Sequence, residues 1–216
     1  TNSNASASLQ KQDGDFTELA AVYGLTYDKR NRTFMPTDGS VFGFVQSVPL
    51  YADKPFIDNT FRFSTYHEFN ENYVGSGKIF LSAINGLNDE DVRLSKRKTL
   101  STRRLRGFSK GKIGPVDGND HIGGNYAAAV NFDVNLPNLL PDSSNTDVSF
   151  FVDFGNVWEV DYDDSLDDSN KLRSSTGVNA SWISPIGPMT FTLATNLSKA
   201  STDTTESFNF NLGTSF

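Results

Sequence analysis

Apolar and polar residues alternate with a period of two over long stretches of this chain. The run "FNFNLGTSF" at residues 208–216 is the clearest case. Its phenylalanines, leucine and threonine fall on one face, and its asparagines, glycine and serine fall on the other. Successive residues of a strand point to opposite faces. The run therefore predicts a strand with one face suited to an apolar environment and one suited to water.

The same alternation predicts an all-β, antiparallel fold. It indicates strands near residues 16–28, 41–51, 61–69, 74–85, 126–136, 148–154, 178–183, 189–194 and 208–216. Such strands, about nine in number and roughly 9 to 14 residues long, exceed the five or six residues usual in globular proteins and can cross a bilayer at a tilt. No helical period is evident.

Composition is compatible with a membrane barrel. The chain has 18 Phe and 7 Tyr, yet no stretch approaches the roughly 20 apolar residues that a transmembrane helix needs. A transmembrane β-barrel alternates lipid-facing and lumen-facing residues, so its average hydropathy is low. A soluble sandwich or lipocalin-like barrel is the alternative. Strand length and a polar face rich in Asn, Ser, Thr and Gly favour a barrel with a wet lumen.

The chain is expected to be part of a larger barrel. Its first residues, "TNSNASASLQKQDGD", lack an initiator Met and the features of a signal peptide. Bacterial barrels close with an even number of strands, and an odd number is predicted here. We therefore expect residues 1–216 to form one partial outer-membrane β-barrel domain, with earlier strands elsewhere and a long loop at 86–123.

That loop contains a basic motif, "STRRLRGFSKGKIGP" at residues 101–115, although the formal net charge of the chain is -7. A guanidinium carried into a barrel lumen must be paired, because an unpaired buried charge is costly. Asp133 and Asp153 fall on the polar faces of the next two predicted strands, where they could hold one arginine as a forked acceptor. Gly107 would allow a tight turn, and Phe108 could anchor the loop tip by burial. For Arg103 and Arg104 the favoured interpretation is an exposed patch, free in solvent or in contact with lipopolysaccharide phosphates.

An ordered set of segments resembles the BamA family of outer-membrane assembly proteins. The segments are "GLTYDKRNRTFMPTDG" at 24–39, "LRGF" at 105–108, "IGP" at 113–115, "GGN" at 123–125, "FFVDFGNVW" at 150–158, "SWISPIGPMTF" at 181–191, and the terminal aromatic strand.

The resemblance implies a sixteen-stranded barrel, of which this chain would supply the last nine strands. In the family the loop arginine folds into the lumen and meets acidic residues on adjacent strands. The matching positions here are Leu105, Arg106, Gly107 and Phe108 in the loop and Asp133 and Asp153 on the strands. Leu105 stands where Val is frequent and Asp133 where Glu is common, so we expect a water between Asp133 and Arg106. Gly213 matches a kink in the last strand, and Phe216 matches the terminal aromatic residue.

The resemblance also implies a function. Family members insert β-barrel proteins into the outer membrane of Gram-negative bacteria through a lateral gate at the last strand. The expected partners are unfolded outer-membrane β-barrel clients, accessory assembly lipoproteins, outer-membrane lipid and lipopolysaccharide. No cofactor and no metal are implied. TamA-like assembly factors and two-partner secretion transporters share the barrel and loop and remain the alternatives.

Other functions receive less support from the residues. A passive porin would not need the loop with its two lumen carboxylates, and an enzyme would need a nucleophile and an oriented base. His67 is expected to be a packed or interfacial residue, and His121 has no recognisable partner in the sequence. The acidic run "DYDDSLDD" at 161–168 lacks the spacing of a calcium loop and is interpreted as a solvated external loop. The acidic net charge argues against binding nucleic acid.

Overall fold

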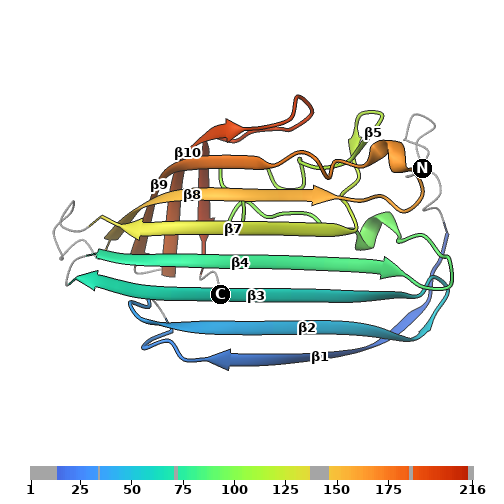
Figure 1. Ribbon diagram of the computed structural model, residues 1–216, viewed down its shortest axis with the longest axis horizontal. Coiled ribbons are helices and arrows are strands. Elements are labelled where there is room, and N and C mark those ends of the chain that lie inside the picture. The colour runs from blue at the N-terminus through green and yellow to red at the C-terminus, as the bar shows by residue number, and fades with distance from the viewer. Residues whose placement is uncertain (1–13, 34, 71–72, 137–145, 185–186, 214–216) are drawn as a thin grey trace.

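The fold is a curved antiparallel sheet whose strands follow one another in chain order (Figure 1). The structure is a computed structural model that describes residues 14–33, 35–70, 73–136, 146–184 and 187–213. The strands of the main sheet are β1 (Glu18–Asp28), β2 (Gly39–Ala52), β3 (Phe56–Asn70), β4 (Tyr73–Gly86), β7 (Tyr126–Asn135), β8 (Thr146–Trp158), β9 (Arg173–Ser184), β10 (Gly187–Ser198) and β11 (Phe208–Leu212). Nine strands were predicted, and nine form this sheet.

The connections differ in length between the two ends of the sheet. At one end, here called the loop end, lie the long segments 87–125, 159–172 and 199–207. The segment 87–125 contains two features that the alternation did not predict, the 3₁₀ turn η1 (Leu94–Lys96) and a small hairpin of β5 (Val116–Asp117) and β6 (Asp120–His121). A second 3₁₀ turn, η3 (Asp164–Leu166), lies in segment 159–172. The sheet is open, with β1 and β11 at its edges.

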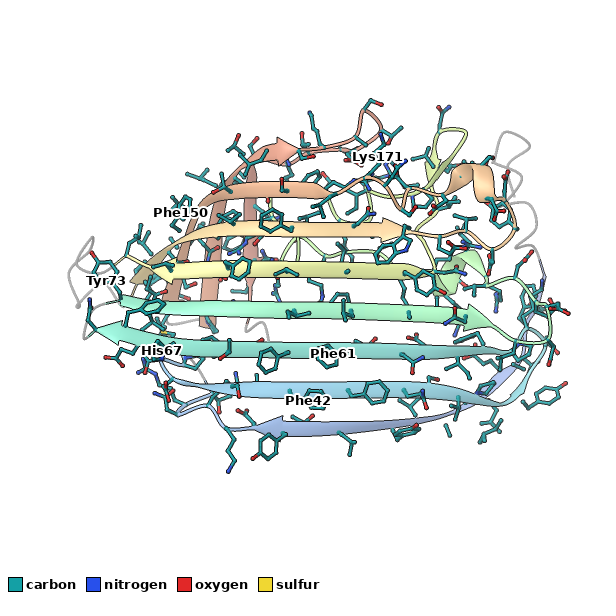
Figure 2. All side chains as sticks on the ribbon, in the orientation of Figure 1. Phe42, Phe61, His67, Tyr73, Phe150 and Lys171 are labelled. Carbon is teal, nitrogen blue, oxygen red and sulfur yellow. The ribbon has the colours of Figure 1, made fainter. Side chains whose placement is uncertain are left out.

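The two faces of the sheet carry the residues that the alternation assigned to them. Large apolar side chains cover the convex face, where Figure 2 labels Phe42, Phe61 and Phe150. Phe150 is 44% exposed there, whereas its chain neighbour Phe151 is fully buried on the concave face. In the described part of the chain, no helix is long and apolar enough to cross a membrane.

The core lies between segment 87–125 and the concave face of the sheet. Apolar side chains of the segment pack on small residues of β7 and on Val157 of β8; the cluster comprises Leu100, Leu105, Phe108, Ile113, Ala127, Ala129 and Val157. The alanines leave room that the loop residues fill, and burial of each large apolar side chain contributes about 1.5–3 kcal/mol. This packing fixes the loop inside the curve of the sheet.

Candidate functional site

Arg106 is held by a carboxylate from β8. Its Nε donates to Asp153 Oδ2 at 2.8 Å and its Nη2 donates to Asp153 Oδ1 at 2.6 Å. The backbone N–H of Arg106 also donates to Asp153 Oδ2, at 3.0 Å. The carboxylate of Asp153 is 0% exposed. A planar fork donating to both oxygens is a strong and specific arrangement that lysine cannot reproduce.

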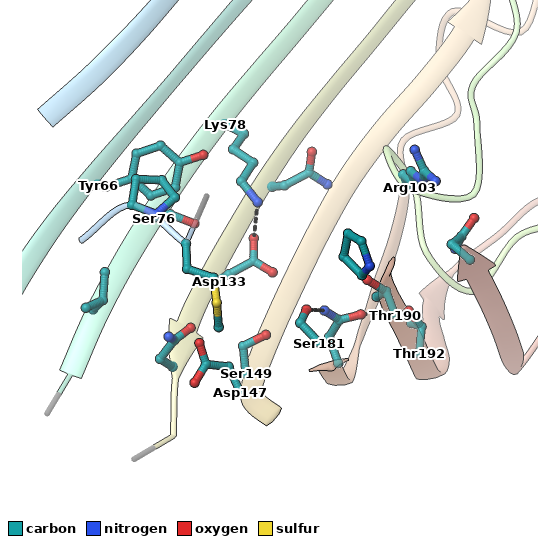
Figure 3. Close-up of a pocket in the computed structure, with 18 of the residues that line it drawn as sticks. Tyr66, Ser76, Lys78, Arg103, Asp133, Asp147, Ser149, Ser181, Thr190 and Thr192 are labelled. Carbon is teal, nitrogen blue, oxygen red and sulfur yellow. Dashed lines mark hydrogen bonds and ion pairs between the residues drawn. The ribbon is translucent and has the colours of Figure 1, made fainter. Parts of the chain in front are cut away.

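A second carboxylate, from β7, completes the pairing of Arg106. Arg106 Nη1 donates to Asp133 Oδ1 at 2.6 Å. The prediction of a water between Asp133 and Arg106 is therefore wrong. The loop brings the guanidinium up to the strand, so the side chain of Asp133 reaches it directly. Lys78 of the adjacent β4 approaches Asp133 from the other side, with Nζ 3.4 Å from Oδ2, and Figure 3 shows the two side chains pointing toward one another.

The side chains around the Arg106 guanidinium stabilise its positive charge. Its carbon atom lies 3.7 Å from the ring centroid of Phe151, a cation–π distance. Asn131 donates to Asp153 Oδ1 at 2.8 Å and so occupies the remaining acceptor capacity. Burial alone would lower the pKa of Arg106, but the hydrogen bonds and charges of Asp153 and Asp133 outweigh burial and raise that pKa above its ordinary value. Arg106 is thus a permanently charged, fully engaged anchor.

The loop residues on either side of Arg106 are buried and closely packed. Leu105 and Phe108 are buried, at 1% and 2% exposure. Gly107 has φ +86°, and a Cβ at this position would come within 3.2 Å of the Ala194 side chain and 3.3 Å of Ser175 Cβ. Glycine is therefore required both for its backbone conformation and for the close approach of the loop to β9 and β10.

The two preceding arginines differ from each other. Arg103 is exposed, as expected. The expectation of an exposed patch is wrong for Arg104, which is half-buried with its guanidinium carbon 3.4 Å from the ring centroid of Phe80. Burial and the nearby charge of Arg62 lower the pKa of Arg104 to about 10. Adjacent arginines in a loop that packs on a sheet cannot all point to solvent, and the sequence alone does not say which one turns inward.

A polar pocket adjoins the anchor on the concave side (Figure 3). The wall formed by β8, β9 and β10 presents hydroxyl groups, with Ser149, Ser181, Thr190 and Thr192 labelled in the figure. Arg30 and Arg32 from the connection between β1 and β2 also line the pocket. The hydroxyl and amide groups belong to the polar strand faces that the alternation predicted.

The last strand is the shortest of the main sheet in the described chain. β10 pairs with β9 from Gly187 to Ser198, but with β11 only from Met189 to Leu193. Gly213 follows β11 with φ +102°, a conformation that favours glycine, and its N–H donates to Pro188 O at 2.8 Å. The predicted terminal aromatic residue, Phe216, and Thr214 lie outside the described residues.

Two buried arginines were missed by the sequence reasoning. Arg97 pairs with Asp161 and Arg173 pairs with Asp168, so the interpretation of run 161–168 as merely solvated is wrong at both ends. Asp163 between them is exposed and accepts from the hydroxyl of Ser165 at 2.6 Å and from the N–H of Ser165 at 2.9 Å, which together hold its pKa below the ordinary range. Arg97 and Asp161 are 64 residues apart and Arg173 and Asp168 are five apart, and neither spacing marks an ion pair in the sequence.

The two histidines make separate contacts in the described chain. His67 Nδ1 lies 3.9 Å from Asp38 Oδ1. His67 is exposed and lies edge-on to Phe69, with ring centroids 5.3 Å apart. A ring nitrogen of His121 lies 3.1 Å from the carbonyl oxygen of Thr202. Across the described ranges, no group of three or more histidine and acidic side chains is placed to hold a metal ion.

Comparison with known proteins places this geometry among relatives. A model of the Omp85 superfamily domain matches residues 1–216. The outer membrane protein assembly factor BamA of Neorickettsia risticii is 27% identical over 218 residues, covering 99% of this chain and 29% of that protein. BamA of Nitratidesulfovibrio vulgaris is 27% identical over 196 residues, covering 87% of this chain and 24% of that protein.

A solved structure is also similar to this chain, with the same sequence identity. The crystal structure of BamA from Haemophilus ducreyi lacking POTRA domains 1–3 matches with a TM-score of 0.83 at 27% identity, covering 88% of this chain and 41% of that chain. The chain therefore has the fold of a BamA barrel and spans less than a third of the length of the curated relatives named above.

Proposed function

The chain belongs to the Omp85 superfamily, and from that membership we propose that it takes part in assembling β-barrel proteins in the outer membrane. Its relatives are outer-membrane proteins of Gram-negative bacteria, and the outer membrane is the location of this chain. The observation that carries the proposal is the buried fork between Arg106 and Asp153, with Asp133 as its second acceptor.

The nine strands are proposed to be the C-terminal part of a larger barrel. The chain covers only part of its relatives, and its sheet has two free edges. A sheet edge in hydrocarbon leaves backbone N–H and C=O groups unpaired, at several kcal/mol for each group. We propose that about seven further strands close the barrel between β1 and β11, with periplasmic POTRA repeats before them. Residues 1–216 are then a partial barrel domain with an inward-folded loop.

The working edge is proposed to be β11. This strand pairs with β10 over five positions, Phe208 to Leu212, so fewer backbone hydrogen bonds hold it than hold the longer strands. An incoming client strand can pair with an edge that opens, by β-augmentation, because the alternative for its backbone in hydrocarbon is to remain unpaired. Gly213 relaxes the end of the strand, since glycine lowers strand stability. The arginine loop, residues 101–115, keeps the concave face of the sheet rigid while the β11 edge opens.

The proposed partners follow from this role. Unfolded β-barrel clients would meet the β11 edge, and accessory assembly lipoproteins would act with the full-length protein. The convex apolar face would contact lipid and lipopolysaccharide, whereas Arg103 lines the polar pocket on the concave side. No chemistry on the client is proposed.

The test is client insertion by the full-length protein in liposomes. A urea-denatured outer-membrane barrel is added, and its folded fraction is followed by the change in gel mobility on heating. We expect faster insertion than into empty liposomes, and slower insertion with Arg106→Ala, because that change leaves Asp133 and Asp153 without their shared guanidinium. Arg103→Ala is the matched control, since this arginine of the same loop is exposed.

Three outcomes would count against the proposal. Parent protein that inserts clients no faster than empty liposomes would remove the assembly role, and passage of an unfolded passenger into the liposome interior would assign the protein to transport. Parent activity in the Arg106→Ala variant would show that the anchor is not needed for assembly.

A further inference from the structure

A second buried arginine cluster lies at the loop end of β9, away from Arg106. Arg173 is 0% exposed. Its Nε and Nη2 donate to the two oxygens of Asp203, at 2.9 Å for Nε to Oδ2 and 2.8 Å for Nη2 to Oδ1. The side chain of Asp203 is also 0% exposed. Nη2 also donates to Asp168 Oδ2, and Nη1 donates to Asn156 Oδ1. The side chain is therefore a clamp between segments 159–172 and 199–207.

Asp203 also bonds to the backbone of segment 199–207, which leads into β11. Its Oδ2 accepts from the N–H of Ala200 at 2.6 Å, which closes the turn between β10 and β11. The three residues after Asp203 do not continue the ladder with β10. Instead their backbone pairs with the arginine loop.

This pairing is a short antiparallel ladder between residues 204–206 and 107–112. The N–H of Ser109 donates to Thr204 O, that of Thr204 donates to Lys112 O, and that of Glu206 donates to Gly107 O, each at 3.0 Å. Phe108 and Thr205 form the bridge at its centre. Asn196 of β10 adds a side-chain bond to Gly107 O at 2.9 Å.

The ladder lies on the side of the segment that faces away from β10. The N–H of Ala194 donates to Ser207 O at 2.8 Å, so Ala194 and Ser207 form a hydrogen-bonded pair of the β10–β11 register. Hydrogen-bonded and non-hydrogen-bonded pairs alternate in an antiparallel ladder, so the N–H of the next residue, Glu206, points away from β10 and donates to Gly107 O. The arginine loop therefore pairs with the side of residues 204–206 opposite β10.

We propose that Arg173 is a positioning residue for the β11 edge: through Asp203 it holds residues 204–206 on the arginine loop and so fixes the start of β11 beside β10. This inference rests on the function proposed above, and it adds how the edge is controlled. Release of the clamp frees residues 204–206 and couples the loop end of β11 to movement of segments 159–172 and 199–207.

The test measures amide hydrogen exchange of the full-length protein in detergent or liposomes, in peptides covering 105–112 and 199–207. Asp203→Asn keeps the size of the side chain but removes its charge, and Arg173→Lys keeps the charge but removes the fork. Hydrogen bonds to charged groups are strong enough that losing one is expected to speed exchange in both peptides by about tenfold or more. Peptides from the interior of β9 and β10 should exchange at the parent rate, which also shows that the variants are folded.

Client insertion is then measured with the same two variants. A rate that differs from the parent rate supports control of the edge by Arg173. Unchanged exchange in 105–112 and 199–207 overturns the clamp, whatever the insertion rate. Faster exchange with insertion at the parent rate overturns its control of the edge while leaving the assembly role intact. A parent protein that inserts no client defeats the proposed function alone, because the exchange result does not depend on clients.

Discussion

Replacing Arg106 by alanine should release the arginine loop from the strands. The change removes the guanidinium that pairs with two inward-facing carboxylates. Removing one partner of a buried ion pair costs roughly 3–5 kcal/mol. Here each carboxylate keeps other donors, since Asp153 retains Asn131 and the backbone N–H of residue 106, and Asp133 retains Lys78. We therefore expect the lower end of that range, about 3 kcal/mol.

Native-state proteolysis can measure this loss. Lys110 and Lys112 of the loop are exposed, but a protease that cuts only after lysine must pull a longer stretch of backbone away from the sheet before it can cut. When reclosing is fast, the cleavage rate follows the population of the open form, so a loss of about 3 kcal/mol corresponds to roughly 150-fold faster cutting. Arg103→Ala should stay within about 0.5 kcal/mol of the parent, as a surface change. Equal cleavage rates for Arg106→Ala and the parent would refute the reasoning, as would an equally large effect of Arg103→Ala.

Three further changes test the surroundings of the anchor. Gly107→Ala should destabilise the loop by about 1–3 kcal/mol, because alanine must adopt a positive φ against close neighbours, and the thermal unfolding midpoint should fall; an unchanged midpoint would contradict the packing. Phe151→Leu keeps an apolar side chain but loses the ring beneath Arg106, so loop proteolysis should speed up by about tenfold, and no change would show that the cation–π contact contributes nothing. The lowered pKa of Asp163 means that its hydrogen bond to Ser165 stabilises the loop above about pH 4 and is lost as pH falls further, so amide exchange in 159–172, corrected for intrinsic rates, should accelerate below that pH; pH-independent corrected rates, or acceleration already near neutral pH, would count against it.

Much of the sheet could be predicted because alternation is a local signal. A strand that separates lipid from lumen must place apolar and polar residues in turn, so each run, such as that from Tyr126 to Asn135, reports its own two faces. The same logic placed Asp133 and Asp153 on the concave side. Their direct contact with one arginine depends on how the loop folds, which the resemblance suggested and periodicity did not.

The loop contacts could not be predicted from alternation, because alternation is a local signal and these contacts join separate segments. Arg97 with Asp161 and Arg173 with Asp203 join segments separated by tens of residues, and any acidic loop residue could have served equally well in the sequence. The burial of Arg104 on Phe80 depends on the direction of the loop backbone. The pairing of residues 204–206 with the arginine loop is likewise a backbone contact, which no side-chain pattern records.

Disulfide capture of a stalled client is the most direct test of the proposal that clients assemble at the β11 edge. The chain has no cysteine, so single cysteines can be introduced without competition from this chain. Asn211→Cys lies on the edge strand, and Asn179→Cys lies on β9 in the interior of the sheet as the matched control. We predict a disulfide between the client's terminal strand and Cys at position 211, and none at position 179. Equal capture at both positions, or no capture at 211 by a protein that still inserts clients, would contradict the account.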